Sequence, residues 1–493
     1  MMAAVTSHLR RGPVQVLILI VFAAVLRIIL TAQRDLHGVE AYLWLWTQRP
    51  ALGYFDHPAM QAWLATPSVA LLGATPLGLR AVFIVTASLS IWLTFLAGRR
   101  LYDERTGVLA ACLVGLAPML FTGMVEGKPD APLLFFWAAT IWALSHALSG
   151  DSPRWWIAAG AFLGFAMDSK YHAVFLALGI PAFLAFSPDQ RAWFRRKEPW
   201  LAVAVSLLVF FPTVLWNARN DWQSFLYQGV TRTVGESSTG LGQIAKFPIR
   251  QLKLITPVVC LWAWAGGIRT LIHWRTADWR ERFLTSIGMP LLIFFCLIAT
   301  VRNVKGYWTG PGYMSLLILS AAMVVRGGIW GRRLHLATIA ILGMVYLAAP
   351  IYVATVPGDL RRSWSKLGAE VAKRPADFVV CDDYHLASEL AFVNRSLDVW
   401  DFSPIGRTSK SFANWWVPGS YLGRNATLVT SGELAAEDQA RIAAAFERVD
   451  PPEPVEILRT PLWGPKDPDR YVIRRAWGYK GPKIVQRVKI DDE

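Results

Sequence analysis

The stretch that decides the fold is VQVLILIVFAAVLRIILTA, residues 14–32, which leads directly into polar and aromatic residues. A helix that crosses the hydrocarbon core of a bilayer needs about 20 predominantly apolar residues, and this run carries a single charge, Arg27. Arg10 and Arg11 precede the run, and no clear small-residue cleavage site follows it. We therefore expect an uncleaved membrane anchor, with Arg27 paired inside the bundle or extended toward the headgroups.

Similar apolar runs recur through most of the chain. They lie at 78–97, 106–123, 131–148, 155–168, 172–187, 199–217, 252–273, 283–300, 311–326 and 333–353. The chain has 493 residues and a mean hydropathy of +0.35, which is more apolar than is usual for a soluble domain of this length. Its 24 tryptophans are typical of aromatic rings anchored at the two membrane interfaces. The pattern predicts a polytopic α-helical membrane protein with about 11–13 transmembrane helices.

Positive charge concentrates in alternate loops. Basic groups precede the first run and recur at 99–105, 191–197, 275–282 and 326–333. With about eleven spans and an N-terminus inside, all of these groups face the cytoplasm, as the positive-inside rule requires. They also account for the net charge of +15 without nucleic acid as a partner. The predicted outer segments are 33–77, 124–130, 169–171, 218–251, 301–310 and the tail.

The composition becomes polar after the last apolar run. Strand-like and helix-like patterns alternate there, which predicts a small α/β domain outside the membrane. We therefore divide the chain into a membrane domain, 1–353, and a soluble domain, 354–493. The four cysteines show neither a disulfide framework nor metal-ligand spacing.

The predicted outer loops bring acids, an imidazole and cations to one surface. Carboxylates there can act as general bases or hold a divalent cation, and Lys or Arg side chains can clamp a phosphate. The set fits an enzyme whose substrate has a lipid tail, a phosphate and a polar head. The candidates are Glu40, Tyr54, Asp56, His57, Lys128, Asp130, Lys170, Tyr171, Arg219, Arg232 and Lys305.

Most of these residues also have a simpler interpretation. Asp130 follows Pro129 at what could be an ordinary helix start, Tyr54 could anchor at the interface, and Lys170 could extend toward the headgroups. The turn Asp56-His57-Pro58 is the hardest to explain as membrane anchoring, although His57 could be a structural hydrogen-bond partner.

Several motifs occur in a fixed order along the chain. After the Glu40 region come GYFDHP (53–58), KPDAPLLFFW (128–137), SKY (169–171) and WNARNDW (216–222), and the tail adds DYHLASELAF (383–392). In these motifs the sequence resembles the GT-C membrane glycosyltransferases, in the branch with protein O-mannosyltransferases and lipid A aminoarabinose transferases. The resemblance covers nearly the whole chain.

The resemblance implies a reaction and a location. Such enzymes take a sugar from a polyprenyl-phosphate donor at the outer side of the bacterial inner membrane and pass it to lipid A, another glycan or a protein. It implies Glu40, Asp56 and Asp130 as catalytic acids, with the other candidates binding substrate and the tail in the periplasm. No cofactor is certain, and a divalent metal at Asp56 is left open.

One position departs from the family pattern. The family usually has Asp-Glu before the Ala-Tyr of the first loop, where this chain has Val39-Glu40. Either Glu40, Asp35 or Asp56 supplies the missing function, or transferase activity has been lost. Two alternatives to an enzyme therefore stay open: a transporter or flippase for a lipid-linked sugar, and a silent relative that acts as a binding subunit. Ionisable residues in outer loops, rather than at mid-membrane, favour the enzyme.

Overall fold

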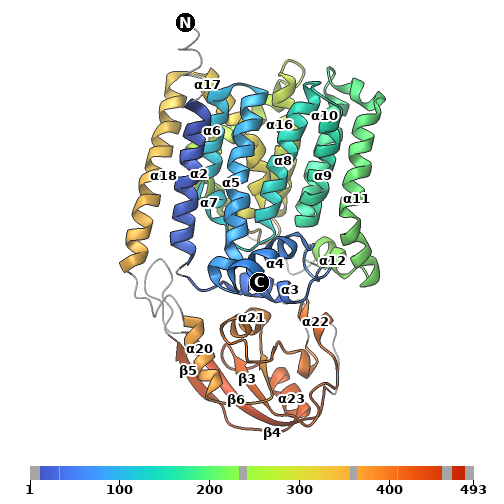
Figure 1. Ribbon diagram of the computed structural model, residues 1–493, viewed down its shortest axis with the longest axis vertical. Helices are drawn as coiled ribbons and strands as arrows, with labels where there is room; N and C mark the ends of the chain where they lie inside the picture. The colour runs from blue at the N-terminus through green and yellow to red at the C-terminus, as the bar shows by residue number, and fades with distance from the viewer. Residues whose placement is uncertain are drawn as a thin grey trace.

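The computed structural model describes residues 11–32, 34–231, 241–355, 363–407, 409–457 and 469–482. A helical bundle occupies the N-terminal part and a small sheet domain lies beyond one end of it (Figure 1). The bundle is formed by α2 (Arg11–Ala32), α5 (Pro76–Leu101), α6 (Glu104–Leu116), α7 (Pro118–Gly123), α8 (Asp130–Leu148), α9 (Arg154–Ser169), α10 (Val174–Phe186), α11 (Lys197–Arg219), α14 (Leu241–Ile255), α15 (Pro257–Ile272), α16 (Trp279–Ile298), α17 (Gly310–Arg326) and α18 (Ile329–Thr355).

The predicted apolar runs all fall on these helices. Among the described residues, seven helices are long and apolar enough to cross a membrane on their own, or up to eight if α14 and α15, bent by 109°, count as one span. The higher predicted count requires α6, α9 and α10 to cross as well, and these shorter helices stand among the long ones in the bundle (Figure 1). The predicted polytopic helical fold is confirmed.

Arg27 and Tyr346 satisfy carbonyl groups where one helix is interrupted. Pro118 separates α6 from α7, and the Leu116 carbonyl accepts a hydrogen bond of 3.0 Å from the Tyr346 hydroxyl. The Phe121 carbonyl accepts one of 3.2 Å from Arg27 Nε, and the guanidinium lies 4.7 Å above the Phe121 ring. Because backbone groups freed by a break cannot turn to water inside a bilayer, such side chains stabilise the break. Arg27 is thus held inside the bundle through its Nε, which is one of the two expected placements.

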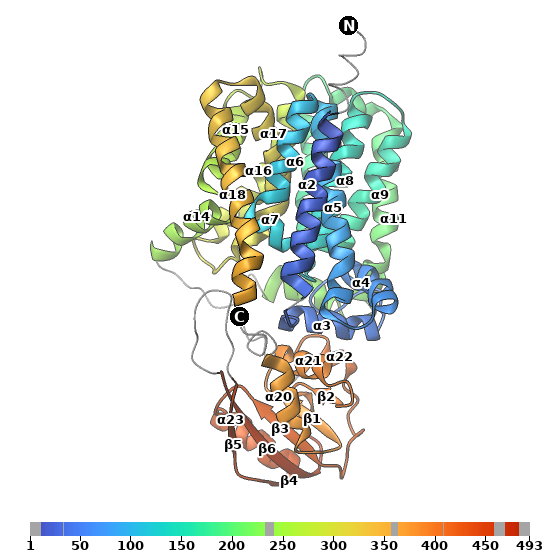
Figure 2. The same cartoon turned by 60° about the vertical axis from the view of Figure 1, so that its left-hand side comes forward.

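The two predicted sets of loops lie at opposite ends of the bundle. The basic stretches at 99–105, 191–197, 275–282 and 326–333 lie at the end near the N-terminus (Figures 1 and 2). The predicted outer segments lie at the end that faces the sheet domain. Two further helices, α3 (Gly38–Gln48) and α4 (Met60–Leu72), cross that end beneath the bundle.

The tail contains a mixed six-stranded sheet with helices. Its elements are α20 (Ser363–Ala372), β1 (Phe378–Cys381), α21 (Tyr384–Val393), β2 (Val399–Trp400), α22 (Phe412–Trp415), β3 (Ala426–Thr430), α23 (Ala436–Ala445), β4 (Phe446–Val449), β5 (Glu453–Ile457) and β6 (Asp469–Tyr479). The strand order is β2-β1-β3-β6-β4, with β5 paired to β6. Strand β1 runs parallel to β2 and β3, and β6 runs antiparallel to its neighbours.

The tail shares a hydrophobic core with the first outer loop. Helix α21 packs on α3, where the ring centroids of Tyr42 and Tyr384 are 5.1 Å apart and those of Trp44 and Phe392 are 5.4 Å apart. One cluster of buried apolar side chains runs without a break from α3 and α4 into the sheet. This shared core holds the sheet domain against the outer end of the bundle.

Candidate functional site

Glu40 lies at the centre of a buried ion pair. Its side chain is 1% exposed, and Oε1 accepts a hydrogen bond of 2.8 Å from Arg80 Nε, while Oε2 lies 2.5 Å from Arg80 Nη2. Glu40 also accepts backbone N–H groups from His37 at 3.0 Å and Gly127 at 3.2 Å. Glu40 therefore fastens the first outer loop to α5 and to the second outer loop.

Those contacts fix the charge of Glu40. Burial alone would raise the pKa of the carboxyl, but the Arg80 charge and the hydrogen bonds lower it to about 2. Arg80 in turn donates to the carbonyls of Thr31, Arg34 and Asp35. Arg80 was missed from the sequence, although a charge inside an apolar run is itself a signal of function.

Asp130 and Lys170 form a second buried ion pair. Asp130 is the first residue of α8 and Lys170 follows the last residue of α9. Lys170 Nζ lies 2.8 Å and 2.9 Å from the two carboxylate oxygens of Asp130, and each residue is 5% exposed. The loops after α7 and after α9 therefore meet at this pair.

Two aromatic rings and a second lysine extend this cluster. Tyr307 and Trp308 belong to η4 (Gly306–Thr309), and their ring centroids lie 5.8 Å and 5.9 Å from Lys170 Nζ. Lys128 Nζ lies 5.2 Å from the Tyr307 centroid and 2.5 Å from a Glu126 oxygen. Burial acts to lower the pKa of Lys128, but the Glu126 carboxylate raises it above its ordinary value, so Lys128 remains cationic.

Asp56 occupies the tight turn that the sequence singled out. Gly53 and Pro58 pair as an isolated bridge, and the Tyr54 N–H donates to the His57 carbonyl at 3.0 Å. Asp56 is 7% exposed, and its Oδ1 accepts a hydrogen bond of 3.4 Å from the Tyr42 hydroxyl. The turn thus presents a carboxylate from a rigid backbone.

The connection between α9 and α10 carries Lys170 and Tyr171 next to each other. Lys170 pairs with Asp130. Burial and then the surrounding charges, Asp56 among them, raise the pKa of Tyr171 to about 12. The Tyr171 hydroxyl also lies 2.7 Å from Ser224 Oγ.

The remaining predicted residues are placed less centrally. The Tyr54 hydroxyl lies 3.0 Å from the carbonyl oxygens of both Trp46 and Arg49 and donates its single proton between them. Its ring stacks on Trp46 at 3.9 Å, so Tyr54 serves the loop itself. His57 and Lys305 are partly buried and Arg219 is exposed. Arg232 lies outside the described residues. In the part of the chain that is described, no three His, Cys, Asp or Glu side chains are grouped to hold a metal.

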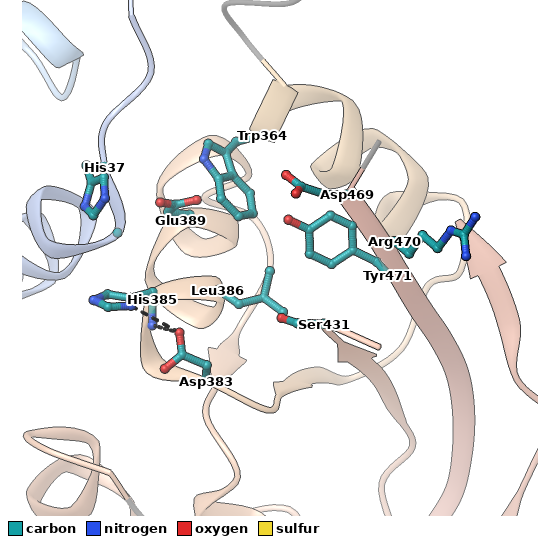
Figure 3. Close-up of a pocket in the computed structure, with 11 residues that line it drawn as sticks. His37, Trp364, Asp383, His385, Leu386, Glu389, Ser431, Asp469, Arg470 and Tyr471 are labelled. Atoms are coloured by element: carbon teal, nitrogen blue, oxygen red, sulfur yellow. Dashed lines mark hydrogen bonds and ion pairs between the residues drawn. The ribbon is translucent and has the colours of Figure 1, made fainter. Parts of the chain in front are cut away.

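A separate cavity of about 350 Å³ lies at the seam between α3 and the tail. Figure 3 shows His37 from the start of α3 facing His385 and Glu389 of α21, with Trp364 and Tyr471 nearby. None of the predicted catalytic acids lines this cavity. The predicted catalytic acids therefore do not belong to this cavity.

Comparison with known proteins finds relatives of the kind that the motifs indicate. A family model described as dolichyl-phosphate-mannose-protein mannosyltransferase matches residues 56–216. The lipid A galacturonosyltransferase of Rhizobium johnstonii is 25% identical, over 74% of this chain and 80% of its own length. An undecaprenyl phosphate-alpha-4-amino-4-deoxy-L-arabinose arabinosyl transferase of Pseudomonas aeruginosa is 26% identical, over 61% of this chain and 58% of its own length.

Solved structures show the same fold. The crystal structure of ArnT from Cupriavidus metallidurans bound to undecaprenyl phosphate superposes with a TM-score of 0.62 at 16% identity, over 93% of this chain and 97% of that one. An oligosaccharyltransferase of Archaeoglobus fulgidus gives 0.51 at 12% identity, over 80% of this chain and 65% of that one. The resemblance to GT-C glycosyltransferases and the multi-pass membrane location are confirmed.

Proposed function

We propose that this chain, a membrane glycosyltransferase with the GT-C fold, moves a sugar from a polyprenyl-phosphate donor to lipid A or a related envelope acceptor. The observation that carries the proposal is the gathering of the Asp130–Lys170 pair and Lys128 around the Tyr307 ring, at the end of the bundle where the turn with Asp56 also lies. The names of the two relatives support the donor and acceptor classes, since one acts on lipid A and the other uses an undecaprenyl-phosphate sugar.

The distribution of charge supports an orientation for this reaction. The basic connections lie at the end of the bundle opposite the site. Because Lys and Arg are enriched in cytoplasmic loops, this supports an N-terminus in the cytoplasm, with the site and the tail at the periplasmic face of the inner membrane. The donor phosphate would then meet the site at the level of the headgroups, with its prenyl chain in the bilayer.

Lys170 and Lys128 are the groups suited to the donor phosphate. Both ammonium groups lie at the ring of Tyr307, and each has a carboxylate partner, Glu126 for Lys128 and Asp130 for Lys170. A lysine acts on a phosphate as a point charge and stabilises the negative charge that develops as the phosphate leaves. Arg219 and Lys305 are proposed to contribute at the rim.

Asp56 is the carboxylate best placed to act on the acceptor. The acceptor oxygen attacks the anomeric carbon, the bond from that carbon to the donor phosphate oxygen breaks, and polyprenyl phosphate leaves. When the acceptor is a hydroxyl, its proton passes to Asp56 as the new bond forms. Glu40 is held by Arg80 in a structural pair, so Asp56, rather than Glu40, is proposed to compensate for Val39.

The direct test follows the envelope lipids of cells with and without this protein. Mass spectrometry is expected to show a lipid species heavier by one sugar only when the protein is present. Asp56→Asn should abolish the species. The matched control is Glu281→Gln, which removes the carboxylate that pairs with Arg269 outside the proposed site and should preserve the species. An unchanged lipid profile would contradict a lipid acceptor. Lipid crossing reconstituted bilayers without a new linkage would instead support a transporter.

Lys170→Met is expected to weaken donor use more than acceptor use. The change removes the ammonium proposed to bind the phosphate. It also removes the ion pair in which Lys170 Nζ lies 2.8 Å from Asp130 Oδ1. Charge-assisted hydrogen bonds are worth about 1.5–3 kcal/mol, so the KM for the donor should rise about tenfold to a hundredfold. Initial rates against donor concentration measure this, with Lys373→Met, a surface change in the tail, as the matched control. A donor KM unchanged in Lys170→Met would remove Lys170 from the phosphate site.

A further inference from the structure

Ser411 of the tail contacts the first outer loop at two residues, Tyr42 and Phe55, and Phe55 directly precedes Asp56. Its backbone N–H donates to the Tyr42 hydroxyl at 2.8 Å, and its Oγ accepts the Phe55 N–H at 3.3 Å. Ser411 is 1% exposed and Tyr42 is 2% exposed. A residue that lies more than 350 positions away in the sequence therefore joins the turn that carries the proposed base.

The Tyr42 hydroxyl accepts one hydrogen bond and donates another. A tyrosine hydroxyl has one proton, and here the oxygen already accepts the Ser411 N–H. The proton is therefore free to be donated to Asp56 Oδ1 at 3.4 Å. Burial and the Asp56 charge raise the pKa of Tyr42 well above its ordinary value, so the hydroxyl keeps this proton.

Aromatic packing holds the Tyr42 ring in place. The centroids of Trp46 and Tyr384 each lie 5.1 Å from that of Tyr42 in edge-on contacts, and Phe412 stacks at 6.3 Å. Tyr384 and Phe412 belong to the tail. A ring caged in this way has little freedom to turn its hydroxyl away from Asp56.

The segment that delivers Ser411 is itself fixed. The buried Asp401 carboxylate accepts the backbone N–H groups of Ser403 at 2.9 Å and Ser409 at 2.8 Å. Lys410 has a φ of +48°, a left-handed conformation that a non-glycine residue adopts only at a cost, and its Nζ lies 3.6 Å from the Tyr384 ring centroid. Strain of this kind persists where the surrounding contacts over-determine the backbone, and it concentrates at functional sites.

We infer that Ser411 and Tyr42 are positioning residues for Asp56, so that the tail domain completes the reactive centre of the membrane domain. This inference rests on the proposed function. A carboxylate that accepts a fixed hydrogen bond is held in one rotamer and is stabilised in its ionised form, which is the form a general base requires. The tail is thereby a part of the catalytic apparatus, and the shared hydrophobic core is what keeps it seated.

The test compares Tyr42→Phe with the wild-type protein reconstituted in full length. Tyr42→Phe keeps the ring and removes only the hydroxyl. The kcat is expected to fall about tenfold with both KM values nearly unchanged. The acidic limb of the pH–rate profile should move upward by about half a pH unit, because the ionised form of Asp56 loses a donor.

Tyr479→Phe is the matched control. It removes a buried hydroxyl that donates to the Pro404 carbonyl at 2.6 Å within the tail, so it reports the general cost of losing such a group. It is expected to leave the pH–rate profile unmoved. If Tyr42→Phe also keeps the wild-type profile and kcat, the positioning role is overturned.

A second measurement does not depend on turnover. Tyr42→Phe, Asp56→Ala and the double variant form a cycle of apparent Tm values in detergent. If the two groups are coupled, the double variant loses less Tm than the sum of the two single losses. Additive losses of Tm would overturn the contact between Tyr42 and Asp56. A wild-type protein that transfers no sugar from any donor would instead overturn the proposed function and leave the coupling of Tm values intact.

Discussion

Replacing Asp56 with asparagine is expected to lower sugar transfer about a thousandfold, since positioned general bases contribute about 10²–10⁴ to rate. The turn from Gly53 to Pro58 should survive, because the amide can still accept the Tyr42 hydrogen bond and the backbone contacts do not involve the side chain. Membrane abundance and Tm should therefore remain near wild type. Transfer from a labelled polyprenyl-phosphate sugar, measured in single-turnover reactions, checks the result.

The choice of acceptor sharpens this experiment. An acceptor hydroxyl must lose a proton as it attacks, whereas an ionised phosphate oxygen needs none. The loss in Asp56→Asn should thus be large for a hydroxyl acceptor and much smaller for a phosphate acceptor. Asp130→Asn should impair both, because it releases Lys170 from the geometry that meets the donor. Full activity of Asp56→Asn and Asp130→Asn with every acceptor would place the reaction elsewhere.

Glu40→Gln is expected to have the largest effect on stability. The change leaves Arg80 buried at 6% exposure without its anionic partner, and breaking one side of a buried ion pair costs about 3–5 kcal/mol. The first outer loop should loosen from α5 and from Gly127, which precedes Lys128. Thermal unfolding in detergent measures the loss, and Arg80→Met combined with Glu40→Gln should recover part of it. A Glu40→Gln protein as stable as the wild type would contradict this role.

The same pair predicts a dependence on acidity. Glu40 has a pKa of about 2 in the folded protein, below the ordinary value of 4.5. Its contribution is therefore fully present above about pH 4.5 and is lost as the pH falls toward 2. Tm measured between pH 6 and pH 3 should fall more steeply in the wild type than in the double variant that lacks the pair.

The positions of the membrane helices and the positive charge of alternate loops could be predicted from the sequence, because both are local properties of the chain. An unbroken apolar run predicts a membrane helix wherever it occurs, and the alternation of basic loops separates the two ends of the bundle without any knowledge of packing. The turn at Asp56 was found for the same reason, since an acid and an imidazole beside a membrane span stand out in the chain itself. The sequence did not decide whether Asp56 binds a divalent metal. It also did not decide which of the acids would be buried in an ion pair.

The partners of the acids were decided by the tertiary structure. Glu40 meets Arg80, which lies hidden in an apolar run, Asp130 meets Lys170, and Tyr42 meets Ser411 from the tail. Helix rotation, loop closure and the seating of the tail bring these groups together, and each depends on side-chain packing between segments far apart in the chain. The residue types were therefore legible from the sequence, whereas the division between a structural acid at Glu40 and a reactive acid at Asp56 depends on contacts that exist only once the chain has folded.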